Sequence, residues 1–185
     1  MSDRTTLRAR RLVIGAALGL ITLAGAACQP VATVPTTTST TTTTSATTPT
    51  TIPPAPAVTS VACPAGGTVT VATSIAGNVR ALLAAAKVGG LSLCGGGYRT
   101  AAAQIAVRKA NCGTSYYAIW QMPSSQCSPP TAIPGTSMHE KGLAIDFTRC
   151  DTRATPCYVW LAANAKTYGL VNLPSEPWHW STNGR

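Results

Sequence analysis

Residues 137–147 read SMHEKGLAIDF, and this stretch combines a predicted strand with a group of chemically reactive side chains. Its second half, GLAIDF, is apolar except for Asp146, which predicts a short β-strand that carries a carboxylate. A carboxylate among apolar residues is costly unless a proton, a side chain or a metal compensates its charge. The same stretch contains His139, one of the 2 histidines of the chain. The partner of Asp146 is therefore the first question that this sequence raises.

Around this stretch, helices and strands are predicted without regular alternation. Three helices are indicated by apolar periodicity and by capping residues, over residues 74–87, over residues 100–111 and from Thr155 onward. Extended segments are predicted at residues 91–93, 142–147 and 170–180, with an irregular loop at 113–136. This mixture predicts an α+β fold, with a small sheet packed against helices.

The first 28 residues have the pattern of an export signal. Four arginines precede an apolar run from Leu12 to Ala27, and small residues precede Cys28. The run is shorter than the roughly 20 residues that a membrane-spanning helix needs. The pair Arg10-Arg11 loosely fits a twin-arginine signal, but simple positive charge explains it as well, so the export route stays open.

Between this signal and the folded part, residues 29–60 are rich in threonine and proline and predict a disordered tether. One folded domain is then predicted at residues 61–185. Cys28, directly before the tether, resembles the lipid-modified cysteine of bacterial lipoproteins. The alternative is ordinary cleavage near Ala27 and a freely secreted protein. The sequence thus predicts an exported bacterial protein, either lipid-anchored in the cell envelope or secreted, that meets a membrane only through this anchor.

Charge limits the partners. Downstream of the signal, ten lysines and arginines stand against four acidic residues. A basic surface favours an anionic partner, such as nucleic acid, anionic lipid or a bacterial wall polymer. Export argues against nucleic acid, whereas the charge alone does not choose between anionic lipid and a wall polymer. The protein is expected to be a monomer.

The seven cysteines divide into one at the signal junction and six in the predicted domain. An even set in an exported domain predicts three disulfides, although the sequence alone allows fifteen pairings. Joining nearest neighbours predicts the pairs Cys63–Cys94, Cys112–Cys127 and Cys150–Cys157. A cysteine zinc site is the rival interpretation, but the chain contains no C-x-x-C.

Two short motifs contain both histidines. Ser-x-His-x-x-Gly-x-Ala-x-Asp spans residues 137–146, and Glu-x-x-His spans residues 176–179. Two imidazoles and one carboxylate, from His139, Asp146 and His179, are a sound ligand set for a catalytic zinc ion with one open position. Zinc would then compensate the charge of Asp146.

Glu176, three residues before a candidate ligand, is the natural general base for the attacking water. Taken singly, each residue has a plainer interpretation: a packed histidine, an aromatic core cluster, or an aspartate that caps a turn. The scarcity of acidic residues and histidines favours a metal site over these plainer interpretations. Asp146 and Glu176, two of the four acidic residues after the signal, fall in these motifs together with both histidines. The His-Glu-x-x-His helix of the zincin metalloproteases is excluded, because position 143 is Leu143.

Together, the two motifs resemble the VanY-type D-alanyl-D-alanine carboxypeptidases, zinc peptidases related to the hedgehog fold. The segment GGGYRTAAAQ at residues 95–104 is similar to a Gly-Tyr-Arg segment of that family. The resemblance covers about residues 75–182. It implies a hedgehog/DD-peptidase-like fold, here stapled by disulfides, and a zinc peptidase that cuts peptidoglycan stem peptides.

The resemblance also assigns roles to individual residues. It implies that His139, Asp146 and His179 bind zinc and that Glu176 is the catalytic base. It implies that Arg99 stabilises the substrate carbonyl or carboxylate, and that Ser137 and Gln104 contact substrate. The alternative is a non-catalytic, zinc-containing module that binds the cell wall. Whether the enzyme acts as a carboxypeptidase, dipeptidase or endopeptidase depends on the pocket, which the loop 113–136 is expected to shape.

Overall fold

The computed structural model describes residues 52–185 of the protein. The signal, Cys28 and most of the predicted tether lie outside these residues. The elements, in chain order, are β1 (Val58–Ala62), β2 (Thr68–Ala72), α1 (Thr73–Val88), β3 (Gly95–Gly96), α2 (Ala101–Cys112), α3 (Tyr116–Trp120), η1 (Ser124–Gln126), β4 (Ala144–Phe147), α4 (Pro156–Asn164), η2 (Ala165–Tyr168), β5 (Val171–Asn172) and β6 (His179–Ser181). No helix of the described residues is long and apolar enough to cross a membrane.

The strands form two antiparallel sheets. A hairpin pairs β1 with β2, and a second sheet has the strand order β3-β4-β6-β5. One of the two inner strands of this second sheet is the predicted strand β4, which lies between β3 and β6. In this register Asp146 is opposite Gly96 on one side and opposite His179 on the other. Pairing of β4 with β6 thus joins the two sequence motifs directly.

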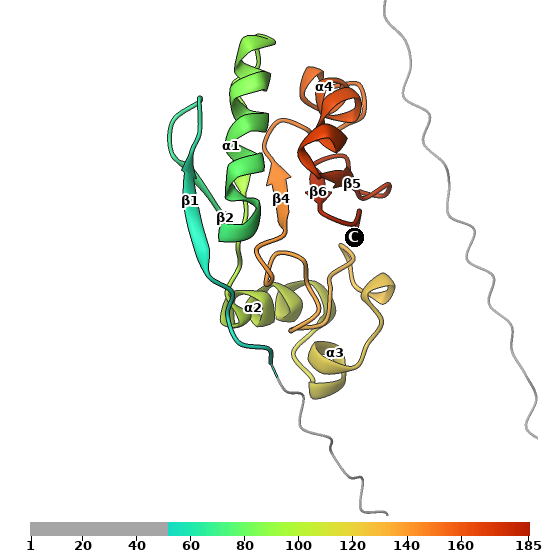
Figure 1. Cartoon of the computed structure of the whole chain (residues 1–185). Helices are drawn as coiled ribbons and strands as arrows, with labels where there is room; N and C mark the ends of the chain where they lie inside the picture. Colours follow the sequence, from blue (N-terminus) through green and yellow to red (C-terminus); the bar gives the residue numbers. More distant parts are fainter. Residues whose placement is uncertain (1–51) are drawn as a thin grey trace, which may run out of the picture. The chain divides into compact units, whose positions relative to one another are not determined.

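Helix α1 supplies one wall of the core. Its buried face consists of Ala76, Val79, Leu82, Leu83 and Ala86, which confirms the helical periodicity read from the sequence. These side chains belong to the same buried cluster as Ile145 and Phe147 of β4 and Leu161 of α4. Figure 1 shows α1 beside the β1–β2 hairpin, with β4 between α1 and the α4–β6 region. Burial of this cluster holds β4 in place.

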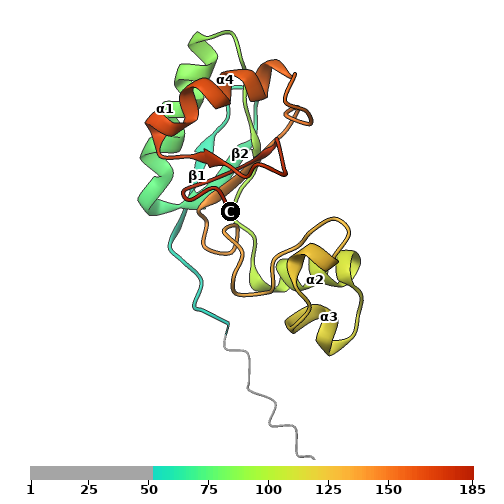
Figure 2. The same ribbon diagram turned by 90° about the vertical axis from the view of Figure 1, so that its right-hand side faces the viewer.

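Helices α2 and α3 lie together at one end of the described part, away from α1 and α4 (Figure 2). Thr100 caps α2 by accepting a hydrogen bond from the amide of Ala103, as predicted. Helix α3 was not expected, because the region 113–136 was predicted to be irregular. Its five residues begin after Ser115, whose hydroxyl accepts from the amide of Ala118. A capped helix of one or two turns is too short to produce a clear periodicity.

The region around β3 also differs from the prediction. The alternation of Leu91 and Leu93 predicted a strand there, whereas the strand lies at Gly95–Gly96. At Gly97, a side chain would collide with the main-chain oxygen of Thr70 in β2. This glycine therefore allows two backbones to approach closely, which only a residue without a Cβ permits.

Three disulfides join nearest neighbours along the chain, as the cysteine spacing predicted. The pairs are Cys63–Cys94, Cys112–Cys127 and Cys150–Cys157. The first ties the β1–β2 hairpin to the segment before β3, and the second ties the end of α2 to the loop that follows α3. The third links the segment after β4 to the first turn of α4. Each therefore fixes a loop to a neighbouring element.

The folded part begins earlier than the composition indicated. Strand β1 starts at Val58, whereas the predicted boundary was residue 61. Val61 is 1% exposed, and the five residues of β1 pair in register with β2. The last residues of the predicted tether are thus part of the hairpin.

Candidate metal centre

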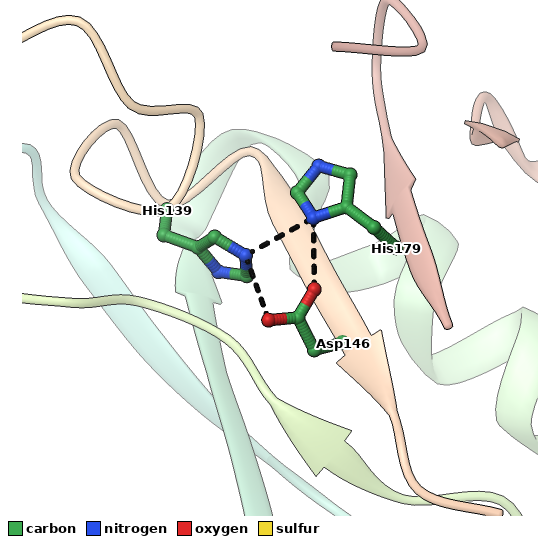
Figure 3. A group of neighbouring side chains, drawn as sticks. All are labelled: His139, Asp146 and His179. Carbon is green, nitrogen blue, oxygen red and sulfur yellow. Dashed lines mark hydrogen bonds and ion pairs between the residues drawn. The ribbon is translucent and has the colours of Figure 1, made fainter. Parts of the chain in front are cut away.

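Three side chains from separate parts of the chain converge at one point (Figure 3). His139 Nε2 lies 3.2 Å from His179 Nδ1 and 3.2 Å from Asp146 Oδ2. His179 Nδ1 lies 2.8 Å from Asp146 Oδ1. One donor atom from each residue falls within 4.8 Å of the other two. The structure therefore brings together the three residues that the sequence motifs predicted as ligands.

The sheet register places two of these ligands. Asp146 and His179 are directly opposed residues of β4 and β6. Directly opposed side chains on neighbouring strands have Cβ atoms about 5 Å apart, close enough to share one ion. The ion pair between them follows from strand pairing rather than from any long-range loop.

His139 is placed by the turn that precedes β4. Gly142 follows it with φ +66° and leaves no room for a Cβ, because that atom would lie 2.6 Å from the amide nitrogen of Ala72. Its own oxygen accepts a hydrogen bond of 2.8 Å from the same amide. The glycine of the Ser-x-His-x-x-Gly motif thus lets this turn dock against β2, which fixes His139 over Asp146.

The outer nitrogens of both imidazoles have acceptors. His139 Nδ1 lies 2.7 Å from the oxygen of Gly97, and His179 Nε2 lies 2.9 Å from the oxygen of Arg185. Since these oxygens only accept, the outer nitrogens of the neutral rings carry the hydrogens. The inner nitrogens, 3.2 Å apart, then direct two lone pairs at each other. A proton on His179 or a metal ion bound by both rings relieves this repulsion, and the N, N, O donor set suits zinc.

The close approach of these three side chains shifts the pKa values of Asp146 and His179. Burial raises the pKa of Asp146, but hydrogen bonds from His139 and His179 and their charge outweigh it and hold the pKa far below its usual range. Burial lowers the pKa of His179, but the hydrogen bonds to Asp146 and to the oxygen of Arg185, together with the negative charges of Asp146 and Glu176, outweigh it, and the net direction is upward. In the absence of metal, the carboxylate is thus charged and the ring holds a proton tightly.

Glu176 stands half-buried beside this group, one turn before His179. Its main-chain oxygen accepts a hydrogen bond of 3.0 Å from the amide of His179, which closes the turn between them. Burial raises the pKa of Glu176, while the charge of His179 lowers it and that of Asp146 raises it. Glu176 is not one of the three converging residues. This placement suits a carboxylate that accepts a proton near the metal without binding the metal.

Arg99 reaches the same centre from the segment before α2. Its guanidinium lies 3.9 Å from Asp146 Oδ2, and its NH1 group donates a 2.9 Å hydrogen bond to Gln104 Oε1. Gln104 is 1% exposed and donates to the oxygen of Ala132. Both groups of this amide are therefore engaged within the protein. Gln104 orients Arg99, whereas its predicted contact with substrate stays a prediction.

Ser137 lies behind the ligand turn. Its hydroxyl accepts a 3.2 Å hydrogen bond from the amide of His139, and the residue is 6% exposed. Glu140, which the sequence did not single out, accepts from the amides of Gly135 and Ser137 at 2.8 Å and 3.4 Å. Burial raises the pKa of Glu140. These bonds close the turn that carries His139, and the predicted substrate contact of Ser137 stays a prediction.

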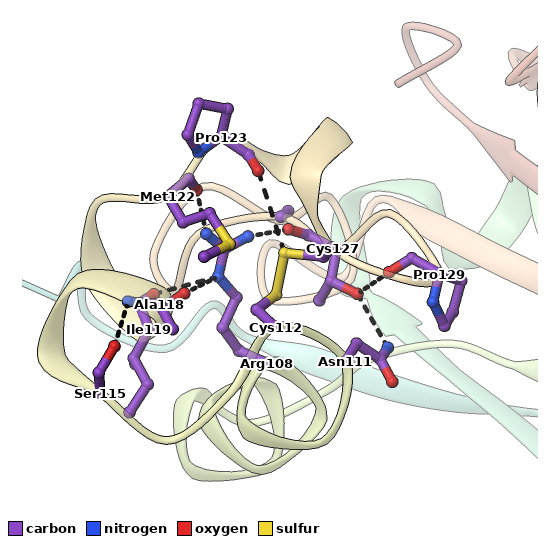
Figure 4. The surroundings of a disulfide bond; sticks show 12 residues. Arg108, Asn111, Cys112, Ser115, Ala118, Ile119, Met122, Pro123, Cys127 and Pro129 are labelled. Carbon is purple, nitrogen blue, oxygen red and sulfur yellow. Dashed lines mark hydrogen bonds between the residues drawn. A yellow bond between two sulfur atoms is a disulfide. The ribbon is translucent and has the colours of Figure 1, made fainter. Parts of the chain in front are cut away.

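A buried arginine holds the neighbouring loop. Arg108 is 0% exposed and donates hydrogen bonds to the main-chain oxygens of Ala118, Ile119, Met122 and Thr131 (Figure 4). The Cys112–Cys127 disulfide lies beside this cluster. No carboxylate pairs with Arg108 among the described residues, and burial lowers its pKa. The sequence did not indicate this role of Arg108, because a basic side chain on a helix usually faces solvent.

Fold and site together define a class of protein, a mononuclear metal-dependent hydrolase: two histidines and an aspartate would hold one metal ion, with a ligand position left for water, and a carboxylate base stands nearby. Comparison with known proteins narrows this class. Residues 68–185 match the VanY family, described as D-alanyl-D-alanine carboxypeptidase. The chain therefore belongs to the VanY family of D-alanyl-D-alanine carboxypeptidases.

Solved structures agree with this family. VanYB in complex with D-alanine-D-alanine is 25% identical, with a TM-score of 0.50, over 70% of this chain and 80% of that one. A Zn(II) complex of a mutant VanY D,D-pentapeptidase from a VanB-type vancomycin resistance cassette has the same identity and TM-score, over 70% and 81%. None of the curated proteins compared with this chain matches it. The chain is thus a zinc metallopeptidase of the D-alanyl-D-alanine carboxypeptidase type, as its motifs implied.

Proposed function

We propose that this zinc peptidase removes the C-terminal D-alanine from peptidoglycan stem peptides. The observation that carries the proposal is the convergence of His139, Asp146 and His179 within 4.8 Å, next to Glu176 and Arg99. The similarity to VanYB, whose structure contains D-alanine-D-alanine, supports the substrate class. A non-catalytic wall-binding module would not need a base beside a complete ligand set.

In the proposed reaction, His139, Asp146 and His179 would hold the zinc ion, which would polarise the scissile carbonyl and lower the pKa of a bound water to roughly 7. Glu176 accepts the proton of the attacking water and delivers it to the nitrogen of the leaving D-alanine. The raised pKa of Glu176 brings its proton affinity closer to that of such a water. The water oxygen forms the new bond to carbon as the C–N bond breaks.

Arg99 has the chemistry to orient the substrate. A guanidinium binds a carboxylate through two parallel hydrogen bonds, and the proposed substrate ends in a free carboxylate. Gln104 holds one side of this guanidinium, so Arg99 is aimed at the metal centre before substrate arrives. Preorganisation of this kind lowers the entropic cost of binding.

Product analysis tests the proposed bond. The full-length chain is incubated with pentapeptide and tetrapeptide muropeptides, with and without a metal chelator, and products are identified by mass spectrometry. We expect loss of one alanine from the pentapeptide only, restored by zinc after chelation. Cleavage of the tetrapeptide, or of a bond within the cross-bridge, would contradict the assignment as a D-alanyl-D-alanine carboxypeptidase. Absence of any product would favour the wall-binding alternative.

Substitution of the base gives the sharpest test of the mechanism. We expect Glu176→Gln to lower kcat by at least about 100-fold, the usual contribution of general base catalysis, because an amide cannot accept the proton. Bound zinc, measured by elemental analysis, should stay at one equivalent. The matched control is Asp151→Asn, which neutralises an exposed carboxylate and should leave kcat unchanged. A fully active Glu176→Gln enzyme would remove Glu176 from this role.

We also propose that the catalytic domain acts outside the cytoplasmic membrane, held there by a lipid on Cys28. The signal-like residues 1–28 support export, and three disulfides favour an oxidising compartment. Cys28→Ala is expected to move the protein from the membrane fraction to the soluble exported fraction, as measured by immunoblotting. Unmodified protein found in the soluble exported fraction would contradict lipidation and support free secretion, and a Cys28→Ala variant that stays in the membrane fraction would contradict both.

A further inference from the structure

The last residues of the sequence fold back beneath a metal ligand. After β6 ends at Ser181, the chain turns through Gly184, whose φ is +72°. A Cβ at Gly184 would lie 3.2 Å from the oxygen of Asn172 in β5, so the turn is pressed against the edge of the sheet. This turn, residues 181–185, brings the main-chain oxygen of Arg185 to 2.9 Å from His179 Nε2.

Two side chains fix the turn from within. The amide of Arg185 donates to Ser181 Oγ at 3.0 Å and to Asn183 Oδ1 at 3.2 Å. Ser181 Oγ in turn donates to Asn183 Oδ1 at 3.3 Å. Ser181 is fully buried, at 0% exposed. Both acceptors of the Arg185 amide are thus side chains of the same turn, and Ser181 is immobilised by the sheet.

The contact with His179 has a specific consequence. An oxygen without a hydrogen can only accept, so His179 Nε2 must carry the hydrogen when this bond is made. In the neutral ring, the form that binds a metal, Nδ1 then keeps its lone pair, and Nδ1 is the atom that faces Asp146 and His139. An acceptor at the outer nitrogen of a ligating histidine fixes the ring orientation and raises its basicity.

We propose that Ser181 and Asn183 are positioning residues for the metal ligand His179, and that they act through the main-chain oxygen of Arg185. His139 has an equivalent acceptor, the oxygen of Gly97, which is part of the sheet region. His179 depends instead on a turn that is held by two side chains. This inference rests on the metal-site assignment made above.

Zinc affinity tests the proposal. The full-length variants Ser181→Ala, Asn183→Ala and the double variant are titrated with zinc against a chromophoric chelator. Loss of an outer-shell partner typically weakens metal binding by about 10–100-fold, and we expect a rise of this size in the zinc Kd of the double variant. Thr182→Ala removes a hydroxyl from the same turn, and Arg185→Ala keeps the main-chain oxygen. Both should match the unmodified protein.

A second measurement separates positioning from a general loss of structure. In nitrogen-15 NMR spectra of the zinc-loaded protein, the His179 Nε2 proton should exchange faster with water in the double variant. The His139 Nδ1 proton, bonded to Gly97, serves as the internal reference and should be unchanged. Equal acceleration at both rings would indicate general loosening and overturn the proposal.

The outcomes also separate this inference from the proposed function. A double variant that binds zinc as tightly as the unmodified protein, with unchanged exchange at His179, would overturn the positioning role alone. An unmodified protein that binds no zinc would instead overturn the metal site on which the inference rests. Asn183→Ala changes an exposed side chain, so a folded variant is available even if Ser181→Ala impairs folding.

Discussion

Asp146 keeps its charge because two imidazoles face it. The side chain of Asp146 is about one third exposed, 32%. It is therefore less deeply buried than its position among apolar residues of the sequence indicated. Hydrogen bonds from His139 and His179 outweigh the burial that remains. The same residues that stabilise the carboxylate are its partners in binding a metal, and protons therefore compete with zinc for this site.

Proton competition predicts a pH dependence of zinc binding. The pKa of His179 is raised in the metal-free protein, so its ring starts to take up a proton above the ordinary histidine value of about 6.5. As pH falls through this raised pKa, zinc must displace the proton, and the zinc Kd should rise about tenfold per pH unit. Competition titrations from about pH 8 to about pH 5 measure it. A constant Kd over this range would exclude His179 as a ligand.

The ligands could be predicted from sequence because each lies in a short motif of fixed spacing. Their supporting residues could not. Ser181 and Asn183 are common turn residues, and only the fold brings the Arg185 oxygen to His179. Likewise, nothing in the sequence indicated that Glu140 would close the turn beneath His139. Short motifs identify the residues that bind the metal, whereas the residues that position these ligands are brought to them only by the folded backbone.

At the scale of elements, helix α2 departs from the usual rule that a helix buries its apolar face. Its fully buried residues are the polar pair Gln104 and Arg108, one turn apart on the same face. Its predicted range, residues 100–111, agrees to within one residue with the observed Ala101–Cys112, because caps such as Thr100 depend on local chemistry. The buried face could not be predicted, because its partners are main-chain oxygens of the loop 113–136, which carry no sequence signal.

Removal of the Arg108 side chain should therefore loosen that loop. Arg108→Met fills a similar volume but leaves main-chain oxygens without donors, each costing about 1–3 kcal/mol when it stays buried. We expect the free energy of unfolding in urea to fall by about 3–5 kcal/mol, as is usual when one partner of a buried charged network is removed. Lys109→Met, at the exposed neighbouring position, should change it by less than about 0.5 kcal/mol. Similar stability of both variants would contradict the role assigned to Arg108.

At the scale of the whole molecule, the metal centre depends on elements that carry no ligand. The β1–β2 hairpin was not predicted from the sequence, yet β2 supports both sides of the site. The amide of Ala72 donates to the oxygen of Gly142 at 2.8 Å, and the oxygen of Thr70 accepts from the amide of Tyr98 at 2.6 Å. The first contact holds the turn of His139, and the second holds the segment that contains Gly97. The family match, residues 68–185, includes β2 but starts after β1.

Deletion of β1 should therefore weaken zinc binding at a distance. A chain that begins at residue 63 loses the five residues paired with β2 and the buried side chain of Val61. Burial of one valine contributes about 1.5–3 kcal/mol, so we expect the free energy of unfolding to fall by at least about 2 kcal/mol. With β2 unsupported, His139 is held less firmly, and the zinc Kd should rise by about tenfold or more.

A chain that begins at residue 52 retains β1 and serves as the control. Urea unfolding and chelator competition on both chains measure the two effects. If the shorter chain binds zinc as tightly as the longer one, the hairpin stabilises the fold without positioning the metal ligands.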